Sequence, residues 1–152
     1  MITQQKLNAL FRYNNGFLYW RKNGKIAGWY DNGYARVQIL GKPYLIHRLV
    51  FLMFYGYMPE LIDHIDNDPS NNKIENLREA TRHQNGTNAK TWSNNISGAK
   101  NVSWHKQCKK WRVRISINKK METIGLFDDF DLAELVAVEA RNKFHGNFAR
   151  HF

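Results

Sequence analysis

Cysteine and acidic residues are scarce in this chain of 152 residues, and no apolar run is long. The single cysteine, Cys108, excludes an internal disulfide and a zinc site built from cysteines, and it favours a reducing, intracellular setting. The longest apolar run, Leu49 to Phe54, is far too short to span a bilayer, and the N-terminus does not resemble a signal peptide. We therefore expect a cytoplasmic protein without a membrane partner.

The shortage of acids leaves a strong positive charge. There are 23 lysines and arginines against 13 aspartates and glutamates, which gives a net charge of +10 and a pI near 9.8. Such a balance points to a polyanionic partner, and both DNA and RNA would fit. A hydrophobic fraction of 43% allows a real core, in one ordinary domain or two small ones.

Residues 1–45 carry repeated strand and turn signals. Asn-Gly pairs, which tolerate positive φ and are common in hairpins, separate short runs rich in aromatic and β-branched residues. We predict a small antiparallel sheet. Its basic residues far outnumber its single acid, Asp31, so one face could follow a phosphate backbone, but a solvated sheet face explains the pattern equally well.

The middle of the chain predicts a strand, a loop, a second extended segment and a helix in succession. A short buried helix over 47–56 ends at Gly56, and Leu61–Ile65 follows as a strand. Residues 66–72 form a polar loop, and a second extended segment spans 74–78. Thr81 and Gln84 fit a capping box, so a helix should begin near residue 82.

A carboxylate and an imidazole adjoin at Asp63 and His64, with asparagines recurring at 71, 72, 76 and 85. Hydrolysis by a small nuclease site needs a hard oxygen ligand for a divalent metal, a base to activate water, and an amide to orient that base. These residues offer all three. A lone Asp-His pair is more often a turn or a surface hydrogen bond, and that alternative is weakened here by the spacing of the asparagines.

After Gly98 the pattern changes to three alternating strands and an amphipathic helix over 131–144. In the second strand Trp111 and Val113 share the core face, while Arg112 and Arg114 share the other. Between residues 100 and 120 there are eight basic residues and no acid, so we expect a basic sheet face suited to DNA. A solvated charged face is the alternative, although it would usually mix signs.

Two family resemblances follow from these motifs. The runs His47-Arg48-Leu49-Val50, Asp63-His64-Ile65-Asp66, Asn71-Asn72, Ile74-Glu75-Asn76-Leu77-Arg78 and Thr81-Arg82, with Asn85, resemble the HNH homing-type endonucleases of bacteriophages. The runs Ser97-Gly98, Val102-Ser103-Trp104, Lys110-Trp111-Arg112, Ile124-Gly125-Leu126-Phe127 and His145-Gly146 resemble an ethylene-response-factor-type (AP-two) DNA-binding domain.

The resemblances imply an α+β fold: a small N-terminal antiparallel sheet (1–45) and a ββα-metal nuclease core (46–92), together the HNH domain 1–92, then an AP-two-like domain (97–152) with a three-stranded antiparallel sheet on one helix. They imply that His64 is the general base, that Asn76 orients its ring, and that Asp63 and Asn85 hold one Mg²⁺ or Mn²⁺ ion. They imply that the partner is double-stranded DNA and that the protein is a monomer or a weak homodimer. If the protein is phage-encoded, it would act in the cytoplasm of the host bacterium. The expected DNA-contacting residues are Arg48, Arg78, Arg82, Lys100, Trp104, Lys106, Lys110, Arg112, Arg114 and Lys119.

Several assignments keep alternatives. Asn88 could replace Asn85 as a metal ligand, and His47 is better explained as a cap or a buried structural histidine. Asp66 and Asp68 could serve only to shape their loop. For the whole chain, a non-catalytic DNA-binding regulator on a degenerate nuclease fold is the main alternative to an enzyme, and an RNA-binding or RNA-processing protein is a third.

Overall fold

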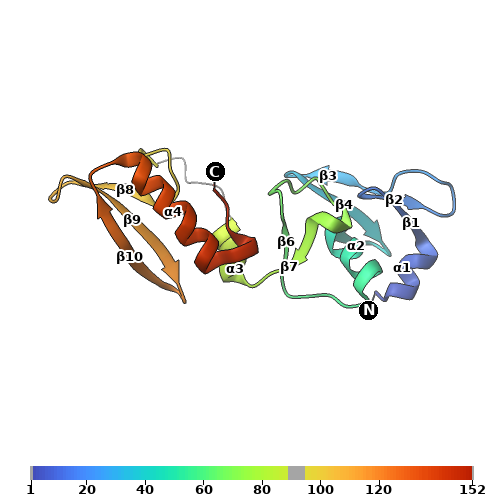
Figure 1. Cartoon of the computed structure of the whole chain (residues 1–152). Helices are drawn as coiled ribbons and strands as arrows, with labels where there is room; N and C mark the ends of the chain where they lie inside the picture. The colour runs from blue at the N-terminus through green and yellow to red at the C-terminus, as the bar shows by residue number, and fades with distance from the viewer. Residues whose placement is uncertain (1, 89–94, 152) are drawn as a thin grey trace. The chain divides into compact units, whose positions relative to one another are not determined.

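The chain folds into two units, Met1–Thr81 and Arg82–Phe152, each with its own apolar core (Figure 1). The computed structural model describes residues 2–88 and 95–151. Helices and antiparallel strands occur in both units, which confirms the mixed α+β class. The helix expected to close the first domain is grouped with the second unit, and the predicted limits 1–92 and 97–152 stay a prediction.

The first unit begins with a helix that the strand-and-turn pattern did not predict. Helix α1 (Gln4–Leu10) follows Thr3, whose Oγ1 accepts a hydrogen bond from the Lys6 backbone N–H at 3.3 Å. Thr3 is therefore a conventional N-cap, and the residues after it are good helix formers. Leu7, the buried residue of α1, joins the core of the unit.

Five strands follow in two small sheets. β1 (Phe11–Asn14) pairs with β2 (Phe17–Trp20), and β4 (Tyr34–Ile39) lies between β3 (Trp29–Asp31) and β5 (Lys42–Leu45), all antiparallel. The Asn-Gly turns at 15–16 and 32–33 have positive φ at both residues, as the hairpin prediction requires. Alternate residues of β4 are buried, so one face of this sheet covers the core.

Helix α2 (Ile46–Tyr55) begins directly after β5 and packs against β4, β5 and α1. Its C-cap is Gly56 in the left-handed region, with φ of 77°, as predicted. β6 (Ile62–His64) then pairs with β7 (Leu77–Glu79), and the short 3₁₀ helix η1 (Ile74–Asn76) leads into β7. The predicted second extended segment is therefore part 3₁₀ helix and part strand.

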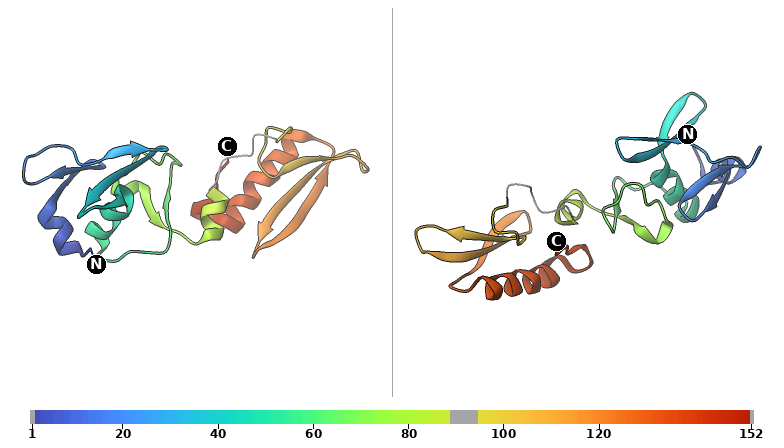
Figure 2. Two further views of the ribbon diagram at one scale, coloured as in Figure 1. Left: turned by 180° about the vertical axis from the view of Figure 1, so that it is seen from behind. Right: turned by 90° about the horizontal axis from the view of Figure 1, so that it is seen from above.

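The second unit starts with α3 (Arg82–Asn88), at the predicted helix start. β9 (Lys110–Ile117) is the centre of an antiparallel sheet between β8 (Val102–His105) and β10 (Lys120–Phe127). Helix α4 (Phe130–His145) runs along one face of that sheet, and its alanines pack on Val102 and Val113 (Figure 2). A last 3₁₀ turn, η2 (Gly146–Phe148), follows α4. Among the described residues, no helix is long and apolar enough to cross a bilayer.

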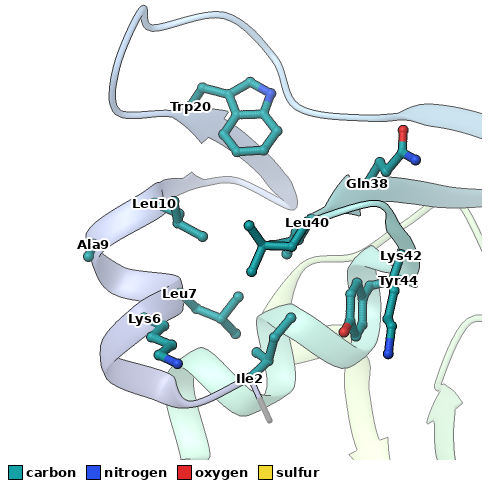
Figure 3. A pocket seen from close by; sticks show the side chains of 11 residues that line it. Ile2, Lys6, Leu7, Ala9, Leu10, Trp20, Gln38, Leu40, Lys42 and Tyr44 are labelled. Atoms are coloured by element: carbon teal, nitrogen blue, oxygen red, sulfur yellow. The ribbon is translucent and has the colours of Figure 1, made fainter.

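A pocket of about 570 Å³ opens between α1, the end of β2 and the turn joining β4 to β5 (Figure 3). Its wall is mainly apolar, and its ionisable lining residues are Lys6, Lys42 and Tyr44. Among the residues that the structure describes, no aspartate, glutamate or histidine lines it.

Candidate active site

Asp63 and His64 lie next to each other on β6 and are both buried, with exposed fractions of 5% and 8%. β6 pairs with β7 in a register that places Asp63 opposite Arg78 and His64 opposite Leu77. Both strands are only three residues long, so the hairpin depends on contacts outside the strand pairing. One such contact is the hydrogen bond from the Ile74 backbone N–H to the Tyr13 hydroxyl, at 3.0 Å.

The Asp63 carboxylate is paired with Arg78. Arg78 Nε and Nη2 both donate to Asp63 Oδ2, at 2.9 and 2.7 Å. Charge-assisted bonds of this kind fix the plane of a carboxylate and compensate its burial. Arg78, predicted to contact DNA, is thus placed against the predicted metal ligand, where its guanidinium is already committed.

The His64 ring is enclosed by three side chains from other elements. Its Nε2 lies 3.4 Å from Asn72 Oδ1. The ring of His47, from the first turn of α2, meets it edge to face at 5.0 Å between centroids, and the Tyr34 ring lies 6.3 Å away. Sequence reasoning missed both aromatic neighbours of His64 as partners, because they come from segments 17 and 30 residues upstream with no local signal linking them to it.

Asn76 does not make the predicted hydrogen bond to His64 but bonds to Asp66 and Asn71 instead. Asn76 Oδ1 accepts from the Asp66 backbone N–H at 3.1 Å, and Asn76 Nδ2 donates to Asp66 Oδ1 and to the Asn71 carbonyl, both at 2.9 Å. Both ends of the amide are occupied in tying down the 66–72 loop. The prediction was wrong because the loop folds back so that Asn72, rather than Asn76, reaches the His64 ring.

The 66–72 loop is also held by its own side chains. Asp66 Oδ2 accepts from Asn71 Nδ2 at 2.6 Å, and Asp68 Oδ1 accepts from the Ser70 backbone N–H and hydroxyl. Burial would raise the pKa of Asp66, but hydrogen bonds from the Asp68 backbone, Asn71 and Asn76 together lower it. Asp66 and Asp68 therefore shape the loop, which was the predicted alternative for both.

Electrostatics set the state of His47. Burial first, then the charges of His64 and Arg48, lower the pKa of His47 from 6.5 to about 3. The side chain is 6% exposed, and its buried Nδ1 has no hydrogen-bond partner among the described residues. His47 is therefore a neutral imidazole at ordinary pH, which agrees with the buried structural histidine expected from the sequence.

Comparisons with known proteins match the region that contains Asp63 and His64. Residues 44–87, which include α2, β6, the loop and β7, match a family model described as HNH endonuclease. Protein 3.8 of Escherichia phage T7 is 41% identical over 91 residues, which are 59% of this chain and 73% of that protein. The chain belongs to the HNH endonuclease family. It also has structural similarity, with a TM-score of 0.42, 25% identity and coverage of 89% of this chain and 84% of the other, to a structure titled "DNA binding and cleavage by the HNH homing endonuclease I-HmuI".

Other predicted site residues of this HNH protein lie on both units. In the first unit, Arg48 donates to the carbonyls of Pro59 and Glu60, at 3.0 and 3.2 Å, and so holds the segment leading to β6. Asn85 lies exposed on α3 in the second unit, and Asn88 is buried there. The predicted partnership of Asn85 with Asp63 stays a prediction, and no comparison supports an AP-two domain in the second unit.

In the second unit, the residues predicted to contact DNA lie on different faces of the sheet. Lys110, Arg112 and Arg114 alternate along β9 on the face turned away from α4, and Lys110 also pairs with Asp128 at 3.0 Å. Trp104 is different, because its register partner is Trp111 and its ring packs edge to face on that residue at 5.0 Å. It therefore shares the side of the sheet that α4 covers.

The remaining predicted DNA-contacting residues lie at the margins of the second unit. Lys106 and Lys119 are exposed in the two turns of the sheet, and Arg82 is exposed at the start of α3. Lys100 is half-buried, and its backbone carbonyl accepts from Arg141 Nη1 at 2.6 Å. Burial, with the charges of Arg141 and Arg150 nearby, lowers the pKa of Lys100 to about 8.

Proposed function

We propose that this chain is a metal-dependent endonuclease that hydrolyses phosphodiester bonds in double-stranded DNA, with His64 as the general base. The observation that carries the proposal is the buried Asp63-His64 pair on a β-hairpin within residues 44–87, the part that matches the HNH family. Burying ionisable side chains costs free energy. A buried adjacent pair with polar partners is therefore a candidate functional site.

The contact with Asn72 suggests which nitrogen of His64 acts. Asn72 Oδ1 is an acceptor, so Nε2 would carry the proton and donate to it across the 3.4 Å separation. Nδ1 would then hold the lone pair that takes a proton from the attacking water. Asn76 supports this arrangement indirectly, through the loop that carries Asn72.

The donor set fits a hard divalent cation. No cluster of three or more His, Cys, Asp or Glu side chains occurs among the described residues, which argues against a zinc centre closed by protein ligands. Mg²⁺ and Mn²⁺ are held by few protein oxygens with several waters, and the proposed ligands are the Asp63 carboxylate and the Asn85 amide. Bound there, the ion would stabilise negative charge developing on the phosphate.

The second unit is proposed to grip DNA through the exposed face of β9. Arg112 and Arg114 stand on that face, and the basic turns carrying Lys106 and Lys119 extend it. This role for a three-stranded sheet on one helix is the one implied by the AP-two resemblance. A single HNH site cuts one strand, so we propose a phage-encoded, homing-type nicking enzyme acting in the bacterial cytoplasm.

The test is cleavage of supercoiled plasmid and phage DNA by the purified chain with Mg²⁺ or Mn²⁺. We expect nicking that EDTA and His64→Ala abolish, while His105→Ala, a histidine change on β8, leaves it intact. DNA affinity should be nearly unchanged in His64→Ala. Salt-sensitive binding without cleavage by the wild-type chain on either DNA would instead favour the non-catalytic regulator.

A further inference from the structure

His47, Tyr34 and His64 bring three rings together from three separate elements, α2, β4 and β6. The centroid distances are 5.0 Å for His47–His64, 5.9 Å for Tyr34–His47 and 6.3 Å for Tyr34–His64, with interplanar angles of 52° to 75°. Tilted and edge-to-face contacts in this range are the favourable arrangement for rings. His64 therefore has ring neighbours on α2 and β4 as well as an amide neighbour in the loop.

The amide neighbour alone is a weak restraint. The Nε2 to Oδ1 separation of 3.4 Å between His64 and Asn72 lies beyond the usual range for a strong hydrogen bond. A general base must be held within a fraction of an ångström and some 10–20° of its working geometry. The ring contacts from α2 and β4 add to that restraint.

We propose that His47 is a positioning residue that holds the His64 imidazole through ring contact, with Tyr34 closing the other side of the enclosure. The inference rests on the proposed function of His64 as the base. His47 acts by shape, because its side chain makes no hydrogen bond within the described part of the chain and its Nδ1 is buried. Its neutrality, which follows from burial, places no positive charge beside a base that must accept a proton.

The experiment compares three variants of the full chain. His47→Ala removes the ring, His47→Phe keeps a ring without nitrogen, and Leu49→Ala removes a core side chain from the far side of α2, two residues along the helix. Each is tested for kcat and KM in DNA nicking. Each is also treated with diethyl pyrocarbonate, and peptide mass spectrometry follows the modification rate of His64, which needs no cleavage activity.

We expect His47→Ala to lower kcat by about tenfold to a hundredfold with little change in KM, the range for a misplaced catalytic group. The modification rate of His64 should rise in the same variant, and His47→Phe should restore most of both properties. Leu49→Ala should lower the unfolding midpoint without changing the reactivity of His64. This last comparison separates positioning from general destabilisation.

Two results would overturn the proposal. If the reactivity of His64 is the same in His47→Ala as in the wild type, the ring contact does not hold the imidazole. If His47→Phe is as impaired as His47→Ala while equally stable, a nitrogen of His47 rather than its shape is required. Absence of cleavage by the wild-type chain would refute the proposed function instead, and the reactivity of His64 would still decide the positioning role.

Discussion

Acidification should destabilise the first unit through His47. The folded pKa of His47 is about 3, below its ordinary value of 6.5. Between these two pH values His47 is protonated in the unfolded chain but neutral in the folded chain. The free energy of unfolding therefore falls as the pH falls. The contribution of His47 is fully present above pH 6.5 and is lost progressively below it.

The magnitude follows from the same two values. The free energy of unfolding should fall by about 1.4 kcal/mol for each pH unit below 6.5. Over the 1.5 units down to pH 5.0, the loss is about 2 kcal/mol. Asp66 and Asp68, whose pKa values are lowered from 3.8, contribute only in more acidic solution. The window between pH 5.0 and 7.5 therefore isolates histidine.

Urea unfolding at pH 7.5 and 5.0 would measure the effect in the wild-type chain and in His47→Phe. Hydrogen-exchange mass spectrometry of peptides from β4 to α2 restricts the readout to the first unit. We expect the wild type to lose about 2 kcal/mol more than the variant between the two pH values. Equal losses in the two proteins would show that His47 is not held neutral in the folded state, and would refute the reasoning.

Three further substitutions test the surrounding structure. Arg78→Ala removes the ion-pair partner of the buried Asp63 carboxylate and should cost about 3–5 kcal/mol in urea unfolding, with Arg78→Lys closer to the wild type. An unchanged free energy of unfolding in Arg78→Ala would contradict a stabilising role for this pair. Gly28→Ala should lower the free energy of unfolding by more than about 2 kcal/mol, because φ is +104° and a Cβ would lie 2.1 Å from the Arg36 carbonyl oxygen. A melting temperature equal to that of the wild type would contradict this close approach. Asn76→Ala removes three loop hydrogen bonds and should cost about 1–3 kcal/mol and speed proteolysis within 66–72; unchanged proteolysis would mean that the loop is held by other contacts.

Local signals in the sequence predicted much of the fold. Gly56 as a C-cap, the Asn-Gly turns, and the alternation along β9 each depend on neighbouring residues, so the sequence pattern carries them directly. Helix α1 was missed because strand signals later in the same region were extended over it. Its N-cap, Thr3, was the available clue.

The partners within the site were harder to predict because they depend on how distant segments meet. The pair Asp63-His64 stands out in the sequence, but which asparagine reaches the ring depends on the course of the 66–72 loop. Arg78 was assigned to DNA because an arginine near a nuclease motif suggests a phosphate contact, whereas the strand register places it opposite Asp63. The side of the sheet on which Trp104 lies also follows from its register with Trp111, and its predicted contact with DNA stays a prediction.

The short hairpin of β6 and β7 has a consequence for how the molecule opens. It contributes only Ile62 and Leu77 to the core, and much of its remaining support is polar: loop hydrogen bonds and the bond to Tyr13. Segments with few apolar contacts exchange their amide hydrogens through local opening, at lower free energy than the core strands. The amides of β6 should therefore exchange faster than those of β4, and the segment that carries the base can loosen while the rest of its unit stays folded.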